Sequence, residues 1–223
     1  MVNRSQAVSR GHALSEQNLV MRNTMLLLSL NFLFSAFTAY LSMTANARPM
    51  GLGVLFVYMG LVFAIQAFRN SGIAILLVFM LTGILGYTLG PLLNFTLQNF
   101  SNGSAIISTA FLGTAGIFGG LSFYAMTTKE DMNYLAGFLT VGSFTVVALS
   151  ILNLLFFQMP IMSLVVASAI LLLSSGWILF ELSAIVRGGQ TNYILATVAI
   201  YVQLYNIFVS LIQILSSLSS RDR

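Results

Sequence analysis

The sequence predicts an all-α membrane protein, a bundle of seven transmembrane helices. Of its 223 residues, 58% are hydrophobic and only 6% are charged, far fewer charges than soluble domains carry. The apolar runs are about 18 to 24 residues long, enough for a helix to cross a hydrocarbon core of about 30 Å. Continuous apolar runs such as 73–85 argue against a β-barrel, whose strands alternate apolar and polar residues.

The first 24 residues are polar and precede the first apolar run. They contain Glu16 and the only histidine, His12, and lack a sustained apolar period, so we expect a loosely ordered cytoplasmic tail over residues 1–24. The first apolar run, 25–44, ends near Ala45-Asn46-Ala47, which fits the small-residue pattern of a signal-peptide cleavage site. The run is longer than an ordinary signal core, which favours an uncleaved first span.

Seven expected spans account for the apolar runs, and short polar turns separate them. Arg48-Pro49 marks the first turn, and Pro91 with Asn94 marks the end of the third span. No linker divides the chain, so residues 25–218 are expected to form one transmembrane domain, followed by a short tail at 219–223. The expected spans are 25–44, 51–68, 72–93, 104–126, 134–157, 161–184 and 193–218.

The basic residues predict the orientation of the chain. Seven crossings place six of them on one side, against three on the other, and cytoplasmic loops carry the excess of Lys and Arg. The amino terminus is therefore expected inside and the carboxyl terminus outside. The six are Arg4, Arg10, Arg22, Arg69, Lys129 and Arg187, and the three are Arg48, Arg221 and Arg223.

Small and polar residues recur at helical spacing in several spans. Gly86 and Gly90 lie in the third span, and Gly116 and Gly120 in the fourth. Small residues let membrane helices approach closely, so these pairs predict helix packing. A polar stripe in the first span has two interpretations, bonding across helices or the lining of a polar cavity. It consists of Asn31, Ser35, Thr38 and Ser42.

The last two spans hold the candidate functional residues. Glu181 is the only acid within an expected span, and a charge at bilayer depth costs roughly 2.5 to 3.5 kcal/mol, so its carboxyl should face other helices or water. The seventh span carries a polar face on which residues recur every three or four positions. That face consists of Gln203, Asn206, Ser210, Gln213 and Ser217.

A short connection favours adjacency of the sixth and seventh helices, which would bring Glu181 and Gln203 to a similar depth. Loss of solvation disfavours the ionised carboxyl. A protonated Glu181 could donate to the Gln203 carbonyl, whereas the ionised form would seek the amide of Gln203 or Asn206, water or a cation. Two interpretations stay open: a proton or cation role, and a carboxyl held permanently protonated between helices.

Known catalytic arrangements are missing from the sequence. His12 lies in the tail, so no serine in the membrane has a histidine base. Asp131 and Asp222 lie outside the expected spans, which excludes a pair of intramembrane aspartates. The chain has no cysteine, no zinc-protease motif and no phosphate-binding loop. We therefore expect neither an enzyme nor a confident metal site, and no basic, aromatic surface for nucleic acid.

Several motifs resemble the Bax-inhibitor/YccA family, most closely its bacterial YccA branch. The resemblance covers nearly the whole chain. The matching residues are Arg22-Asn23-Thr24, the run from Gly86 to Asn94 with Gly86, Gly90 and Pro91, Phe180-Glu181, Ile185, Gly188-Gly189, Thr191-Asn192-Tyr193-Ile194, Ala196-Thr197 and the run from Tyr201 to Phe208.

This resemblance implies a seven-helix bundle in which the other six helices surround the last one. It also implies a multi-pass protein of the bacterial inner membrane that modulates the ATP-dependent protease FtsH and is itself a slow substrate. Other branches are described as pH-sensitive calcium leaks, gated by two aspartates on the sixth and seventh helices. Glu181 stands at the first of those positions, and Gln203, which cannot titrate, stands at the second.

The leading hypothesis is therefore a modulator of FtsH-type quality control, with the lipid bilayer and the FtsH complex as partners and no cofactor. The alternative is a pH-sensitive cation leak through Glu181, Gln203, Asn206, Ser210 and Gln213. Calcium would then be the transported ion, and Glu181 at most a weak calcium contact, because calcium prefers six to eight oxygen ligands. The sequence does not predict an oligomeric state.

Overall fold

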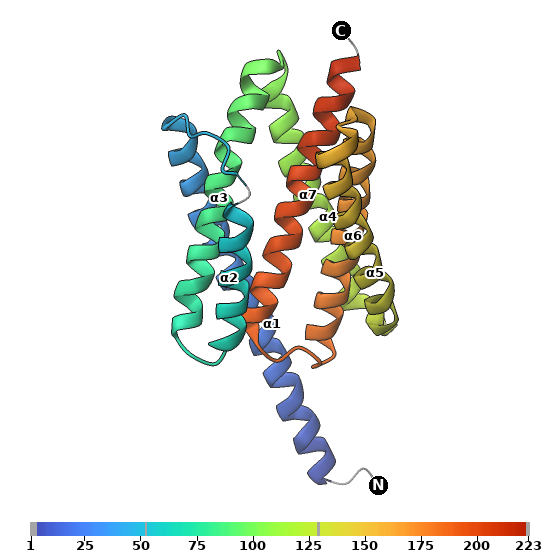
Figure 1. The fold of residues 1–223 in the computed structure, drawn as a ribbon. Helices are drawn as coiled ribbons and strands as arrows, with labels where there is room; N and C mark the ends of the chain where they lie inside the picture. Colours follow the sequence, from blue (N-terminus) through green and yellow to red (C-terminus); the bar gives the residue numbers. More distant parts are fainter. Residues whose placement is uncertain (1–3, 52, 129, 222–223) are drawn as a thin grey trace.

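The computed structural model describes residues 4–51, 53–128 and 130–221. Every regular element in these ranges is helical (Figure 1), which confirms the all-α part of the expected fold class. The elements are α1 (Arg4–Thr44), α2 (Gly53–Ala67), α3 (Ile73–Asn99), α4 (Gly103–Thr127), the 3₁₀ turn η1 (Met132–Tyr134), α5 (Leu135–Leu152), the π-turn η2 (Asn153–Phe157), α6 (Pro160–Val186) and α7 (Tyr193–Arg221).

Six segments of the described chain are long and apolar enough to cross a membrane, judged by length and composition. They lie in α1, α3, α4, the η1–α5–η2 segment, α6 and α7, and α2 is a shorter apolar helix. The start of α1 and the end of α7 lie at opposite ends of the bundle (Figure 1). The expected spans match these helices except at the positions below.

Helix α1 begins at Arg4, so the loosely ordered tail expected over residues 1–24 is wrong for the described part of that range. Many residues there, such as Ala, Leu, Gln, Glu and Arg, are good helix formers. Extending an existing helix avoids the cost of nucleation, which only a new helix must meet. A polar composition is therefore not enough to predict a disordered tail when the segment continues into a long apolar helix.

Helix α3 continues through Pro91 to Asn99, whereas the sequence predicted its end at Pro91 and Asn94. A proline removes one backbone hydrogen bond of the helix. Inside a membrane bundle this loss is tolerated, because hydroxyl side chains and neighbouring helices can bond to the freed backbone carbonyl. The side-chain amide of Asn94 donates to the Met43 carbonyl of α1 at 2.9 Å. Asn94 therefore joins two helices instead of ending one.

Close packing of α1 on α3 is the tightest feature of the bundle, and it confirms the packing role predicted for Gly86 and Gly90. A Cβ built on Gly86 would lie 2.6 Å from the Ser35 hydroxyl and would also overlap the Ser35 carbonyl and the Thr38 hydroxyl. A Cβ on Gly90 would overlap the Ser42 side chain. The polar stripe of α1 thus lies directly against the glycines of α3.

The same prediction is wrong for Gly116 and Gly120 of α4 among the described residues. A Cβ at either position would have no atom within 4 Å. Helix α4 packs on α3, α6 and α7 through other residues, including Ile106, Ala110 and Ala125, which are buried. Spacing shows that two glycines share a face, but it does not show which face meets a neighbour.

Helix α7 is the most enclosed helix. In its most apolar stretch 50% of the residues are buried, compared with 11% in the segment Met132–Phe156 that contains α5. It packs mainly against α1, α3, α4 and α6. Its buried stripe includes Ile200, Tyr201, Leu204 and Ile207.

Candidate functional site

Glu181 lies near the carboxyl end of α6 and is half-buried. Its Oε1 accepts a hydrogen bond of 2.9 Å from the side-chain amide of Gln190, nine residues further along the chain. The expected partners Gln203 and Asn206 are not bonded to it. The sequence therefore placed the acid correctly on the sixth helix but assigned it the wrong partner.

The loop between α6 and α7 explains this partner, because it folds back over the last turn of α6. Gly188 has φ +78°, a conformation that favours glycine. The backbone N–H groups of Gly189 and Gln190 both donate to the Ala184 carbonyl, at 2.8 and 3.1 Å. This reversal, a helix C-cap of the left-handed kind, brings the side chain of Gln190 beside Glu181.

A chain of hydrogen bonds continues from Gln190 to the start of α7. The Oε1 of Gln190 accepts from the backbone N–H of Asn192 at 3.1 Å. The Oδ1 of Asn192 then caps α7, accepting from the N–H groups of Ile194 and Leu195 at 3.0 and 3.1 Å. This is the usual role of asparagine at a helix N-cap.

The same asparagine joins the α2–α3 turn to the cluster. Its side-chain amide donates to the Arg69 carbonyl at 2.9 Å. We call Glu181, Gln190, Asn192 and Arg69 the loop cluster. It ties together α6, the loop, the start of α7 and the α2–α3 turn.

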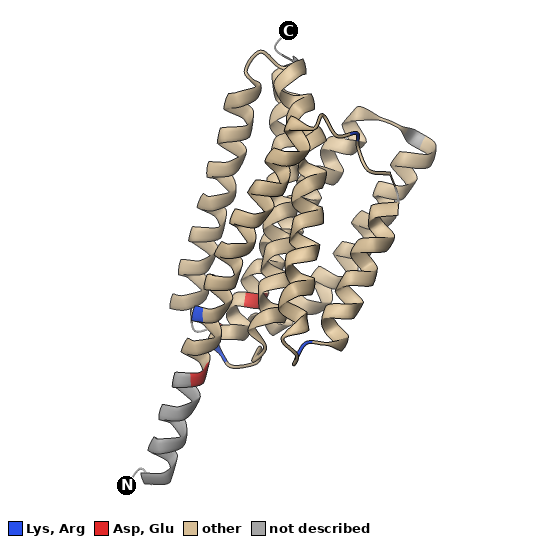
Figure 2. Cartoon of the chain, turned by 90° about the vertical axis from the view of Figure 1, so that its left-hand side faces the viewer, with Lys and Arg blue, Asp and Glu red and all other residues tan. Residues whose placement is uncertain are grey.

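Three further contacts lie around the loop. The Nε of Arg187 donates to the Ser183 hydroxyl at 3.3 Å, and the other end of its guanidinium donates to the Glu130 carbonyl of the α4–α5 loop. A Cβ on Gly188 would lie 2.6 Å from the amide nitrogen of Gln17 in α1. Charged residues gather mostly at this end of the bundle (Figure 2), from which α1 projects.

Sequence reasoning missed Gln190 and overlooked the structural role of Asn192. The signal for Asn192 was available, because an asparagine directly before an apolar helix is a typical N-cap. No signal of spacing or composition marks Gln190, whose role depends on the path of the loop.

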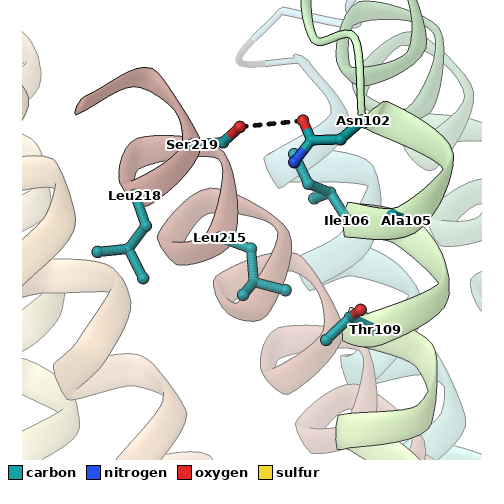
Figure 3. Close-up of a pocket in the computed structure, with 7 residues that line it drawn as sticks. All are labelled: Asn102, Ala105, Ile106, Thr109, Leu215, Leu218 and Ser219. Atoms are coloured by element: carbon teal, nitrogen blue, oxygen red, sulfur yellow. Dashed lines mark hydrogen bonds between the residues drawn. The ribbon is translucent and has the colours of Figure 1, made fainter. Parts of the chain in front are cut away.

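The polar face of α7 does not gather around Glu181. Ser210 is buried, Gln203 and Asn206 are half-buried, and Gln213 is exposed. The most buried stripe is instead the apolar one that includes Leu204 and Ile207. Near the far end of α7, a groove of about 250 Å³ separates it from the start of α4, and there the Ser219 hydroxyl donates to Asn102 at 2.9 Å (Figure 3).

Buried polar bonds link α1, α3 and α7 and support the bonding interpretation of the first-span stripe. The Thr82 hydroxyl donates to the side-chain Oδ1 of Asn31 at 2.7 Å, and the Tyr201 hydroxyl donates to the Ser35 hydroxyl at 2.6 Å. All four side chains are at most 4% exposed. Such bonds fix the register of packed membrane helices.

The described residues contain no group of three or more His, Cys, Asp or Glu side chains that could hold a metal ion. Glu181 instead anchors the loop between α6 and α7, through its hydrogen bond with Gln190. An ionised carboxylate accepts well from an amide donor, and the same amide uses its oxygen for the backbone of Asn192. The carboxyl of Glu181 and the backbone N–H of Asn192, the residue that caps α7, are therefore bonded to the same side chain.

The family model for the inhibitor of apoptosis-promoting Bax1 matches residues 17–220. The chain belongs to the Bax-inhibitor family. The match includes all four residues of the loop cluster and extends from early in α1 to the end of α7. The resemblance predicted from the motifs is thereby confirmed.

Three of the relatives that this Bax-inhibitor chain is similar to come from bacteria. The modulator of FtsH protease YccA from Escherichia coli K12 is 45% identical over 204 residues, 91% of each chain. The uncharacterized protein PA2604 from Pseudomonas aeruginosa is 44% identical over 196 residues, 87% of each chain. An uncharacterized membrane protein from Vibrio cholerae is 35% identical over 215 residues, 93% of each chain.

Proposed function

We propose that this Bax-inhibitor protein modulates, without being an enzyme itself, an ATP-dependent membrane protease of the FtsH type in the bacterial inner membrane. One observation carries the proposal: the relative from Escherichia coli that is named a modulator of FtsH protease is 45% identical over 91% of both chains. A relative from Escherichia coli O6:H1, also 45% identical over 204 residues, is named an inner membrane protein. Identity at this level extends across the whole bundle.

The start of α1 is the element best suited to meet the protease. Helix α1 projects beyond the other helices (Figure 1), at the end where most charged residues collect (Figure 2). Its side chains Glu16, Asn18, Leu19 and Arg22 are exposed. An excess of basic residues marks the cytoplasmic side of a membrane protein, so the proposal places this end in the cytoplasm and the end of α7 in the periplasm.

Co-purification tests the proposed partner. FtsH should be recovered from bacterial membranes with the full-length protein, and a variant lacking residues 2–15 should recover about tenfold less, a loss of about 1.4 kcal/mol in binding. A full-length variant with Glu16→Arg and Arg22→Glu keeps the helix and tests the exposed charges separately. Absence of FtsH with the full-length protein would overturn the proposal, and equal recovery with the shortened one would remove α1 from it.

Reporter fusions test the proposed orientation. Alkaline phosphatase, which requires the periplasm, should be active when fused after Arg223. Green fluorescent protein at the same position should be dark. The reverse result would show that the loop cluster faces the periplasm and could not meet a cytoplasmic protease.

We also propose that α7 is the axis of the bundle, with the other six helices around it. Its packing against four helices supports this arrangement. Site-specific crosslinking can test it: a photoreactive residue in place of Val202 should capture protein neighbours of the same chain. Capture of lipid alone would contradict an axial position.

The cation-leak alternative has less support from the geometry. The carboxyl of Glu181 is hydrogen-bonded to the side chain of Gln190, and the polar face of α7 does not gather around it. Calcium and proton flux into liposomes distinguishes the two functions. We expect equal flux for the wild type and for Glu181→Gln, whose amide can still bond to Gln190. A several-fold fall in flux in the variant would favour the leak over the modulator.

A further inference from the structure

Helix α2 is too short to cross an ordinary bilayer. It contains 15 residues and so rises about 22 Å, less than the hydrocarbon thickness of about 30 Å. The six segments that are long enough to span a bilayer contain 25 to 29 residues. A difference in length of this size requires the bilayer to become thinner, the chain beside the helix to adjust, or both.

Helix α2 is short at its amino-terminal end, on the side of the bundle where α1 ends. At the opposite end, α2 and α3 are joined by a compact turn, in which Ser71 N donates to the Phe68 carbonyl at 2.8 Å. Figure 1 shows that α2 begins well below the end of α1, and that the chain between them runs down along the outside of the bundle. We call residues 45–51 the descending segment.

The descending segment is irregular, and all of its residues except Ala47 are exposed. The N–H groups of Ala45 and Ala47 still bond to the last turns of α1. Within the described residues, no hydrogen bond engages the N–H groups of Arg48, Met50 or Gly51, and all three residues are exposed. Irregular backbone facing lipid does not occur within the hydrocarbon region, because nothing there can accept its hydrogen bonds.

The segment also carries a charge suited to a lipid headgroup. Arg48 is exposed, and its guanidinium can bond to a phosphate through two parallel N–H groups. Just beyond the segment, Leu55, Phe56 and Val57 are 53%, 73% and 49% exposed, which suits contact with acyl chains. Apart from Met50, which is 47% exposed, the exposed large apolar side chains of this face thus begin at the start of α2.

We propose that the bilayer is thinned at this face, so that phospholipid headgroups and water reach the descending segment, and that Arg48 binds a lipid phosphate there. Thinning around a short helix is an ordinary response to mismatch. Water and headgroups satisfy the free N–H groups, and the phosphate compensates the guanidinium at a depth where an unpaired charge is unfavourable. This inference is independent of the proposed protease partner.

Spin labels test the thinning directly, because the chain has no cysteine and each introduced cysteine reports alone. Labels are placed at Met50 and Gly51, at Phe56 in α2, and at Leu172 on the exposed middle of α6, in vesicles of phosphatidylethanolamine and phosphatidylglycerol. Relaxation by a water-soluble nickel complex should exceed relaxation by oxygen at 50 and 51. Oxygen should dominate at 56 and 172. Labels at 50 and 51 that behave like the label at 172 would overturn the proposal.

A second measurement tests the phosphate site. A fluorophore at position 50 is quenched by nitroxide on the headgroup of phosphatidylglycerol or, as control, of phosphatidylcholine. Quenching by phosphatidylglycerol should be about threefold stronger, should persist in Arg48→Lys and should be lost in Arg48→Gln. Inorganic phosphate added to the water should not compete. Equal quenching in Arg48→Gln would overturn the phosphate site, and competition by inorganic phosphate would show a free-anion site instead.

Discussion

The Nε2 of Gln190 lies 2.9 Å from the Oε1 of Glu181, so a loop residue is bonded to the acid of α6. The bond closes a loop of six residues against the helix that precedes it. Because Gln190 also accepts from Asn192, which caps α7, the position of the loop and the first turn of α7 depend on the same side chain.

Replacing Gln190 should loosen this loop. Gln190→Ala removes a hydrogen bond to a carboxyl group in a half-buried position, which is expected to cost about 1 to 2 kcal/mol. Gln190→Glu should cost at least as much, because it places two carboxyl groups together. Thermal unfolding in detergent and hydrogen exchange of residues 187–192 measure both effects. Gln98→Ala, at an exposed position of α3, is the control, and unfolding temperatures equal to that control would contradict the anchor.

Two substitutions of Asn192 separate its two roles. Asn192→Ala removes the cap of α7 and the bond to the Arg69 carbonyl, and a lost cap alone costs about 1 kcal/mol. Asn192→Asp retains an acceptor at the helix start but loses the amide that donates to Arg69. We expect the order of stability wild type, Asp, Ala in urea unfolding. If Asp were as damaging as Ala, the bond to the α2–α3 turn would be the more important of the two.

The glycines of α3 and α4 should differ sharply. Gly86→Ala would place a methyl group against Ser35, and overpacking of this kind costs about 1 to 3 kcal/mol. Gly116→Ala meets no atom within 4 Å and should leave stability unchanged or raise it by up to about 1 kcal/mol, because alanine favours a helix. Unfolding temperatures of the two variants, measured in the same detergent, provide the comparison. A large loss in Gly116→Ala would indicate a partner on that face of α4.

Tyr201→Phe tests the buried polar bonds among α1, α3 and α7. The hydroxyl of Tyr201 bonds to Ser35 in a position that is 1% exposed, and its removal should cost about 0.6 to 1.7 kcal/mol, the range for hydrogen bonds inside a membrane bundle. Tyr134→Phe, at a position that is 72% exposed, is the matched control. Equal unfolding temperatures for the two variants would show that this bond adds no stability.

Composition and run length alone determined the class of this protein, because a chain with so few charges and so many long apolar runs can bury its backbone only as membrane helices. They also placed seven helices, and the motifs identified the family. These features are encoded locally, in the sequence of each helix.

Tertiary structure decided the partner of Glu181, the buried face of α7 and the depth at which α2 begins. Lipid is as apolar as a leucine core, so the same apolar helix face can contact lipid or neighbouring helices. The positions of Leu204 and Ile207 in the sequence therefore did not show which of the two they contact. The partner of Glu181 depends on how six loop residues turn at Gly188. The start of α2 depends on the path of the descending segment, which composition does not encode.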